Sequence, residues 1–284
     1  MYEKYWLITT EHLADHLWFK DEEDFKAGMN FVPILVQKLP VKVFAFVLMS
    51  NHVHFVLSCS RRIAEEYINK FKSLYSRYYS IKYDSKELLR GIGLDFRELS
   101  TQDESFLRAV AYVQMNPVAA NISINASDYP WGTGGCFFKT LKTNTKKVKD
   151  ISGRTLIKMI HSKIPLPPQY EIEESGYISP SSYVSTAFVE SIFRTPNRMN
   201  YFLRTSSKAR LVCESPSFSD QVLISALKDL CTSLYKTTKF SFLGDAQKSQ
   251  ILKQMHFRFS ADPNQLSRVC ELPYDTVCTL MESF

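Results

Sequence analysis

Two apolar runs joined by a short polar turn constrain the fold more than any other feature of the chain. Residues 41–49 and 52–58 are rich in Val, Phe and Leu, and the turn-prone pair Ser50-Asn51 lies between them. Such runs predict two neighbouring buried β-strands. Because alternate side chains on a strand share a face, His52 and His54 are expected to project from the same face of the second strand.

The elements around this hairpin alternate between strands and helices. The pattern predicts a strand over 5–10, a helix from Asp21 toward Leu35, a helix over 63–83, a strand over 91–99 and a helix from Glu104 that Pro117 ends after Asn116. This order predicts an α+β fold, namely a ferredoxin-like antiparallel sheet with its helices on one face. Residues 150–284 have a mostly helical pattern, so a mainly helical C-terminal region is expected to follow.

Changes in composition along the chain predict three segments: a first domain over 1–132, a Lys-rich linker over 133–150 and an accessory region over 151–284 whose role the sequence does not assign. Residues 139–149 hold five lysines and no acid, which suits both a solvated linker and an arm that contacts phosphates. Residues 263–281 have helix-turn-helix spacing. The second of these helices carries Asp275 and Glu282 but no Lys or Arg, which favours a structural helical bundle over a DNA-reading helix.

The overall charge favours a polyanionic partner. Lys and Arg outnumber Asp and Glu by 35 to 29, giving a net charge of +6, and phosphate backbones are the commonest such partner. No apolar stretch reaches the ~20 residues that a membrane span requires. The first residues lack the basic start and apolar core of a signal peptide, and the six scattered cysteines form no Cys-x-x-Cys pair. We therefore expect a cytoplasmic protein with no membrane partner.

Four side chains carry most of the chemical information. His52 and His54 could form half of a divalent metal site, or they could be polar residues that meet water at a strand end. Tyr112 and Asn116 lie four residues apart, so they share one face of the predicted helix. The amide oxygen of Asn116 is a hard ligand that, with two imidazoles, leaves positions on Mg²⁺ or Mn²⁺ open for phosphate oxygens. Tyr112 could then attack that phosphate, although a tyrosine on a helix face also packs well in a core.

Two segments together resemble a known family. Residues 49–57, Met-Ser-Asn-His-Val-His-Phe-Val-Leu, resemble the metal-binding segment of the single-tyrosine HUH transposases. Residues 112–120, Tyr-Val-Gln-Met-Asn-Pro-Val-Ala-Ala, resemble the nucleophile helix of the REP-associated branch of that superfamily, and Pro130-Trp131 follows as is usual there. The resemblance covers residues 5–131, and Ser50 stands where the family usually has proline.

The resemblance implies a chemistry and a role for each of these residues. His52 and His54 are expected to be metal ligands, Asn116 fills the place of the third ligand, and Tyr112 is the nucleophile. Residues 1–132 would then be an HUH-type catalytic domain with Mg²⁺ or Mn²⁺ as its cofactor. The expected activity is cleavage of single-stranded or hairpin DNA through a 5′-phosphotyrosine intermediate, followed by strand transfer in DNA transposition. Both a monomer and a homodimer are compatible with the family.

Other functions remain open at this stage. A histidine-triad phosphohydrolase would need a histidine at the position of Val56, so this class is disfavoured. A nickase or relaxase-like protein would use the same chemistry without mobilising DNA. A domesticated protein could bind or nick repeat hairpins without transposition. The helix over 63–83 also combines cations and aromatic rings that would suit single strands, but a solvated face with core tyrosines explains them equally well. These residues are Lys70, Lys72, Arg77, Lys82, Tyr75, Tyr78 and Tyr79.

Overall fold

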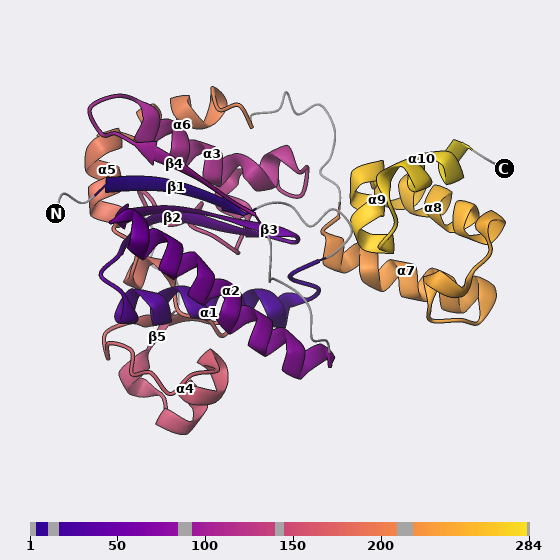
Figure 1. Ribbon diagram of the computed structural model, residues 1–284, viewed down its shortest axis with the longest axis horizontal. Helices are drawn as coiled ribbons and strands as arrows, with labels where there is room; N and C mark the ends of the chain where they lie inside the picture. The colour runs from indigo at the N-terminus through magenta and orange to yellow at the C-terminus, as the bar shows by residue number, and fades with distance from the viewer. Residues whose placement is uncertain (1–3, 11–16, 85–92, 140–144, 209–217, 283–284) are drawn as a thin grey trace.

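A four-stranded antiparallel sheet forms the centre of the first part of the protein in the computed structural model (Figure 1). The structure describes residues 4–10, 17–84, 93–139, 145–208 and 218–282. The strands are β1 (Lys4–Thr10), β2 (Lys42–Met49), β3 (His52–Cys59) and β4 (Leu94–Leu99), in the sheet order β2-β3-β1-β4. Helices α1 (Glu22–Lys38) and α2 (Arg61–Tyr83) connect them in the order β1-α1-β2-β3-α2-β4. This is the ferredoxin-like topology, so the predicted α+β fold class is confirmed.

Helices cover both faces of the sheet. Phe55 points toward α2, where its ring contacts the rings of Tyr67 and Phe71. The neighbouring His54 points to the other face and contacts Tyr112 in α3 (Ser105–Ala119). Helix α1 shares the face of α2, but the expectation that all helices would lie on one face is corrected for α3. The reason is that all eight residues of β3 are buried, so both faces of this strand require a cover.

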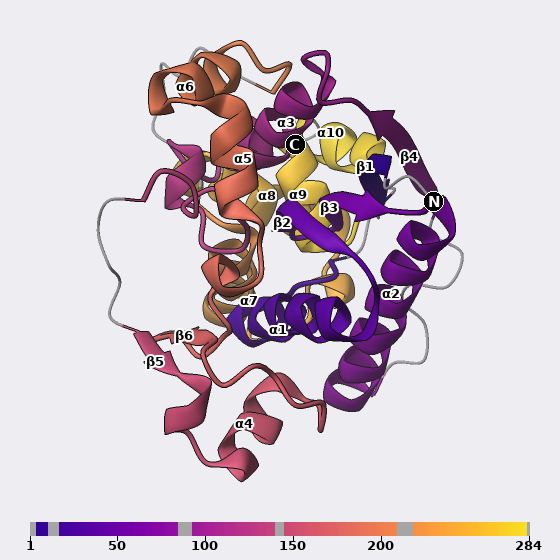
Figure 2. The same cartoon turned by 90° about the vertical axis from the view of Figure 1, so that its left-hand side faces the viewer.

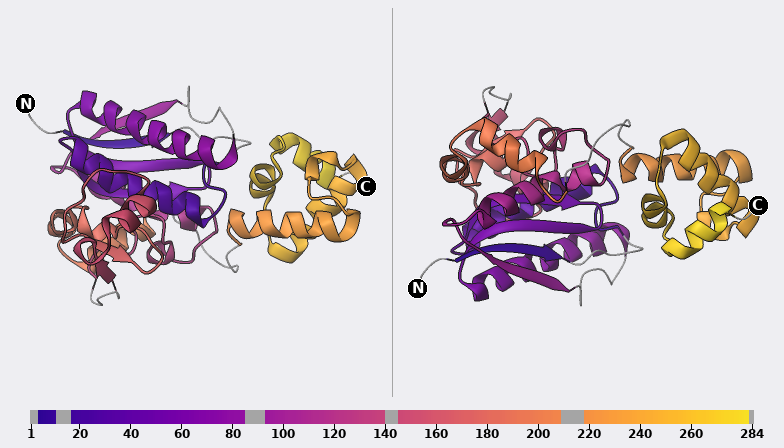
Figure 3. Two further views of the ribbon diagram at one scale, coloured as in Figure 1. Left: turned by 90° about the horizontal axis from the view of Figure 1, so that it is seen from below. Right: turned by 90° about the horizontal axis from the view of Figure 1, so that it is seen from above.

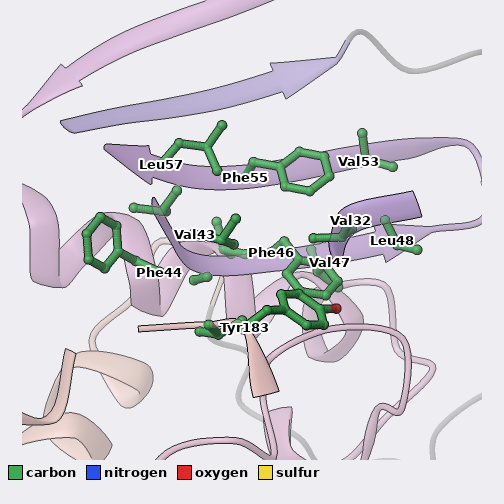
Figure 4. Packing of buried hydrophobic residues seen from close by; sticks show 14 of the residues in the cluster. Val32, Val43, Phe44, Phe46, Val47, Leu48, Val53, Phe55, Leu57 and Tyr183 are labelled. Carbon is green, nitrogen blue, oxygen red and sulfur yellow. The ribbon is translucent and has the colours of Figure 1, made fainter. Parts of the chain in front are cut away.

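The residues after α3 cover the free edge of β2. Leu48 donates its backbone N–H to Trp131 O at 2.8 Å, and Thr133 donates to Phe46 O at 3.0 Å. Farther along the edge, Ser185 N donates to Val43 O at 2.9 Å. An unpaired edge strand is a template for aggregation, and these contacts occupy that edge. Figure 4 shows Tyr183 beside Phe46 in the same core, and their rings lie 6.3 Å apart.

The hydrophobic cluster that contains the sheet continues to Phe202. It incorporates side chains of α4 (Gly153–Ile160), α5 (Thr186–Phe193), α6 (Pro196–Arg204) and the short strand β6 (Glu171–Glu173), which pairs with β5 (Thr145–Lys147). Short 3-10 helices lie at Ala126–Asp128, Val148–Asp150, Pro180–Ser182 and Phe240–Phe242. Buried Asn30 on α1 connects the sheet domain to residues 159–178, because its side chain donates to Met159 O and accepts from Ile178 N. The expected boundary at residue 132 therefore does not separate two cores.

A second hydrophobic cluster runs from Leu223 to Leu280. It is built by α7 (Asp220–Tyr235), α8 (Asp245–Phe259), α9 (Pro263–Cys270) and α10 (Tyr274–Glu282), which lie together at one end of the molecule in Figures 1 and 3. The C-terminal region is thus mainly helical, as predicted, and residues 271–273 separate α9 from α10. Gln221 connects this bundle to the first part by donating to Phe19 O at 2.9 Å. Within the described ranges, no helix combines the length and the apolar character that crossing a bilayer demands.

Candidate active site around Tyr112

His52 and His54 lie side by side on the face of β3 that α3 covers. Their ring centroids are 4.8 Å apart and the ring planes meet at 86°, and both side chains are buried. Nδ1 of His52 lies 2.7 Å from Asn51 Oδ1. Because an amide oxygen only accepts, Nδ1 carries a proton, and in the neutral ring Nε2 then carries the lone pair. Nδ1 of His54 lies 3.0 Å from Thr9 Oγ1. Hydrogen bonds of this kind at one ring nitrogen orient the other nitrogen of a metal-binding histidine.

Tyr112 stands next to this pair. Its ring centroid lies 5.3 Å from that of His54, with the planes at 85°, and the side chain is half-buried. Burial raises the pKa of the Tyr112 hydroxyl, and the nearby negative charge of Asp95 raises it further. The phenol is therefore protonated at neutral pH. Lys208 Nζ lies 5.3 Å from the ring centroid and supplies a positive charge at the same position.

Asn116 lies one helical turn beyond Tyr112, and its side chain hydrogen-bonds to the backbone of the helix. Its Nδ2 donates to Tyr112 O at 2.8 Å and to Val113 O at 3.5 Å. Pro117 has no N–H to offer Val113 O, and the amide of Asn116 takes that place. Helix α3 accordingly continues past Pro117 to Ala119, whereas the sequence predicted an end at Asn116. Since Nδ2 is occupied by the backbone, only Oδ1 of Asn116 could bind a metal.

The donor types at this position suit a divalent ion. Two imidazoles with one amide oxygen would make a mixed nitrogen and oxygen set of the kind that Mn²⁺ and Mg²⁺ accept. Across the ranges that the structure describes, no three or more His, Cys, Asp or Glu side chains gather into a group that could hold a metal. A site here would therefore depend on the amide of Asn116 as its third protein ligand.

A cavity of about 700 Å³ opens beside Tyr112. Its walls come from β1, β4, α3 and the segment that ends α6, and they carry both basic and acidic side chains. The charged members are Asp95, Arg97, Glu104 and Arg108. Arg108 is paired with Glu104. The volume lies within the range typical of ligand sites, and Tyr112 is one of the lining residues.

Several of these residues were not singled out from the sequence. Arg108 lies four residues before Tyr112, so helical spacing alone would have placed it on the same face. Asp95 pairs with Thr9 across β1 and β4, and this register needs the sheet order. Lys208 follows α6, beyond the predicted domain boundary, and no sequence signal connects it with Tyr112.

Comparison with known proteins gives a distant likeness. No family model matches the chain, and no curated protein matches it. Among solved structures, the chain is similar to a REP-associated tyrosine transposase bound to a REP hairpin, with a TM-score of 0.39 and 14% sequence identity. The match covers 47% of this chain and 79% of that chain.

Proposed function

We propose that this protein cleaves single-stranded DNA with Tyr112 as the nucleophile and rejoins strands by the reverse step, as in DNA transposition. The observation that carries the proposal is the contact between the rings of Tyr112 and His54, 5.3 Å apart, in a site where His52 lies alongside. A nucleophile and a pair of imidazoles thus converge next to a cavity that could admit a phosphodiester.

His52, His54 and Oδ1 of Asn116 would hold a divalent ion, which would polarise the scissile phosphate when bound. Tyr112 Oη would form a bond to phosphorus while the bond from phosphorus to the 3′ oxygen breaks. The phenolic proton passes to solvent, and the departing 3′ oxygen takes up a proton. One phosphodiester is exchanged for another, so the 5′ end stays on the tyrosine and no high-energy cofactor is consumed.

Cations at the cavity could meet the phosphates of this substrate. Arg97 and Arg108 could neutralise the flanking phosphates, and Lys208 lies against the ring of Tyr112. These residues come from three separate elements, which would let a single strand pass across the site while one phosphate meets Tyr112.

The decisive experiment looks for the covalent intermediate. Wild-type protein is incubated with hairpin-flanked single-stranded oligonucleotides and Mg²⁺ or Mn²⁺, and SDS-stable adducts are separated on a gel. Tyr112→Phe should give no adduct, whereas Tyr201→Phe, at an exposed tyrosine on α6, should give the wild-type yield. An adduct that persists in Tyr112→Phe would disprove the role of Tyr112. A wild-type protein that binds a varied pool but never forms an adduct would instead be a DNA-binding protein.

A further inference from the structure

A second cavity lies on the side of the sheet opposite Tyr112. It has a volume of about 840 Å³ and is enclosed by α1, α2, α4 and the residues that follow α4. Helix α2 packs on the face of Phe55, whereas Tyr112 contacts His54 on the other face. Figure 2 shows α4 beside α1 and far from α3. The cavity is therefore separate from the candidate active site.

Basic side chains line this cavity, and no Asp or Glu of the described residues does. Lys38 comes from the last turn of α1, Arg77 from α2, and Lys163 from the segment after α4. All three are exposed, and none forms an ion pair with a residue in the described ranges. Lys82 also lines the cavity, but Asp21 and Asp24 neutralise it. Three cations therefore face the space without a carboxylate partner.

The remaining wall is apolar and aromatic. Ile81 is 77% exposed and Ile157 is 43% exposed, although both are large apolar side chains. The ring of Tyr78 is fixed at the same wall, because its hydroxyl donates to Asp24 at 3.0 Å and its ring centroid lies 5.0 Å from that of His161 in an edge-type contact. A ligand that covers these side chains removes apolar area from water, which favours binding. The ligand that fits must therefore combine a flat apolar part with negative charge.

We propose that this cavity binds one or two nucleotides of a single-stranded DNA segment. A base would cover Ile81 and the ring of Tyr78, and the adjoining phosphates would meet Arg77, Lys163 and Lys38. Stacking surfaces combined with cations are the usual means of holding single strands without reading their sequence. The proposal rests on the proposed function only in its choice of DNA as the polyanion. Because the cavity is on the opposite face, the strand would have to pass around the sheet to reach Tyr112.

The test measures binding in EDTA, so that no covalent step enters the result. A fluorescein-labelled dT15 is titrated with the full-length protein, followed by anisotropy. Arg77→Ala combined with Lys163→Ala should weaken binding about tenfold. The slope of the logarithm of the binding constant against the logarithm of the salt concentration should become shallower by about 1.4, since each phosphate contact to a single strand contributes about 0.7. The control is Arg62→Ala with Lys158→Ala, which removes one exposed cation from α2 and one from α4, both outside the cavity, and should change binding less than twofold. An equal loss in both double variants would overturn the proposal.

A local probe identifies the ligand. The variant Ile81→Trp places a fluorophore on the exposed wall, and dT15 should quench it with the same midpoint as the anisotropy titration. Quenching by phosphatidylglycerol vesicles but not by dT15 would overturn the proposal in favour of a lipid surface. Free dTMP that binds as tightly as dT15 would overturn the proposal that the cavity holds part of a strand. Neither measurement uses Tyr112, so failure here and failure to form the adduct are distinguishable.

Discussion

The ring of Tyr112 meets the ring of His54 edge-on, with centroids 5.3 Å apart and an interplanar angle of 85°. The two residues lie on a helix and a strand that are far apart in sequence, so core packing sets this distance. Phe106, at the start of the same helix, contacts Phe44 and Tyr5 on the sheet at 5.4 Å each. Aromatic packing at Phe106, six residues before Tyr112, therefore anchors the helix that carries Tyr112.

Removing the hydroxyl of Thr9 should weaken the site without altering the fold. Thr9→Val keeps the β-branched shape that suits a strand but loses the contact to His54 Nδ1 at 3.0 Å. Loss of such an orienting hydrogen bond typically lowers metal affinity or activity 10- to 100-fold. The measurements are Mn²⁺ affinity by calorimetry and the rate of adduct formation. The control is Thr232→Val on α7, an exposed threonine in the C-terminal bundle, which should match wild type. Unchanged Mn²⁺ affinity in Thr9→Val would contradict the metal role of His54.

Asn116 offers a test of the metal site that does not depend on activity. Asn116→Asp loses the donor to Tyr112 O and Val113 O and sets a carboxylate against two carbonyl oxygens. In EDTA we expect the free energy of unfolding of Asn116→Asp, measured in urea, to be about 1–3 kcal/mol lower than that of wild type. Saturating Mn²⁺ should restore part of this loss, since the carboxylate is a stronger ligand than the amide. Asn116→Leu, with no ligand atom, should lose stability in both conditions. An equal response of Asp and Leu variants to Mn²⁺ would rule out a metal at Asn116.

Local rules in the sequence account for the parts of the fold that depend on neighbouring residues. The hairpin at Ser50-Asn51 and the shared face of His52 and His54 follow from strand alternation alone. The start of α1 follows from Asp21, whose side chain accepts from Asp24 N while Asp24 accepts from the backbone of Asp21. These features need no knowledge of distant contacts, which is why the ferredoxin-like order could be predicted.

The features that escaped prediction are set by contacts between distant residues. Nothing in the apolar pattern around Val43 indicates that Ser185 would hydrogen-bond to it and extend the first core. The late end of α3 depends on an amide side chain that replaces a missing backbone donor, which proline rules do not include. The position of Lys208 over Tyr112 is likewise a result of tertiary packing. The metal roles of His52, His54 and Asn116 stay predictions for the experiments above.

The turn after Trp131 should tolerate no side chain at Gly134. A Cβ built there would lie 1.9 Å from Ala126 O, a backbone atom that cannot move aside cheaply. Gly134→Ala should therefore lose about 1–3 kcal/mol of unfolding free energy. At Gly153, in the first turn of α4, nothing lies within 4 Å of the built Cβ, so Gly153→Ala should gain about 0.4–1 kcal/mol. Urea unfolding of both variants measures whether the two changes in unfolding free energy have opposite signs. A Gly134→Ala protein as stable as wild type would show that the backbone around Gly134 can shift to make room.

Asp24 should matter more to stability than any exposed acid near it. Its carboxylate is fully buried, accepts from Lys20 N at 2.8 Å and from the hydroxyl of Tyr83 at 2.8 Å, and pairs with Lys82 at 2.7 Å. Asp24→Asn removes the charge and turns amide hydrogens toward groups that are themselves donors. We expect a loss of about 1–3 kcal/mol in urea unfolding, since leaving buried donors without their acceptor has effects of this size.

The matched control for Asp24 is its neighbour. Glu23 is exposed and pairs with Lys26 at 2.7 Å on the surface of α1, so Glu23→Gln should change the unfolding free energy by no more than about 0.5 kcal/mol. Both variants remove one negative charge from the same turn of the same helix, so the helix dipole and the net charge change alike. A difference between them therefore reports the buried hydrogen bonds of Asp24. Equal small losses in the two variants would mean that water replaces those bonds, and that this junction of α1 and α2 is open in solution.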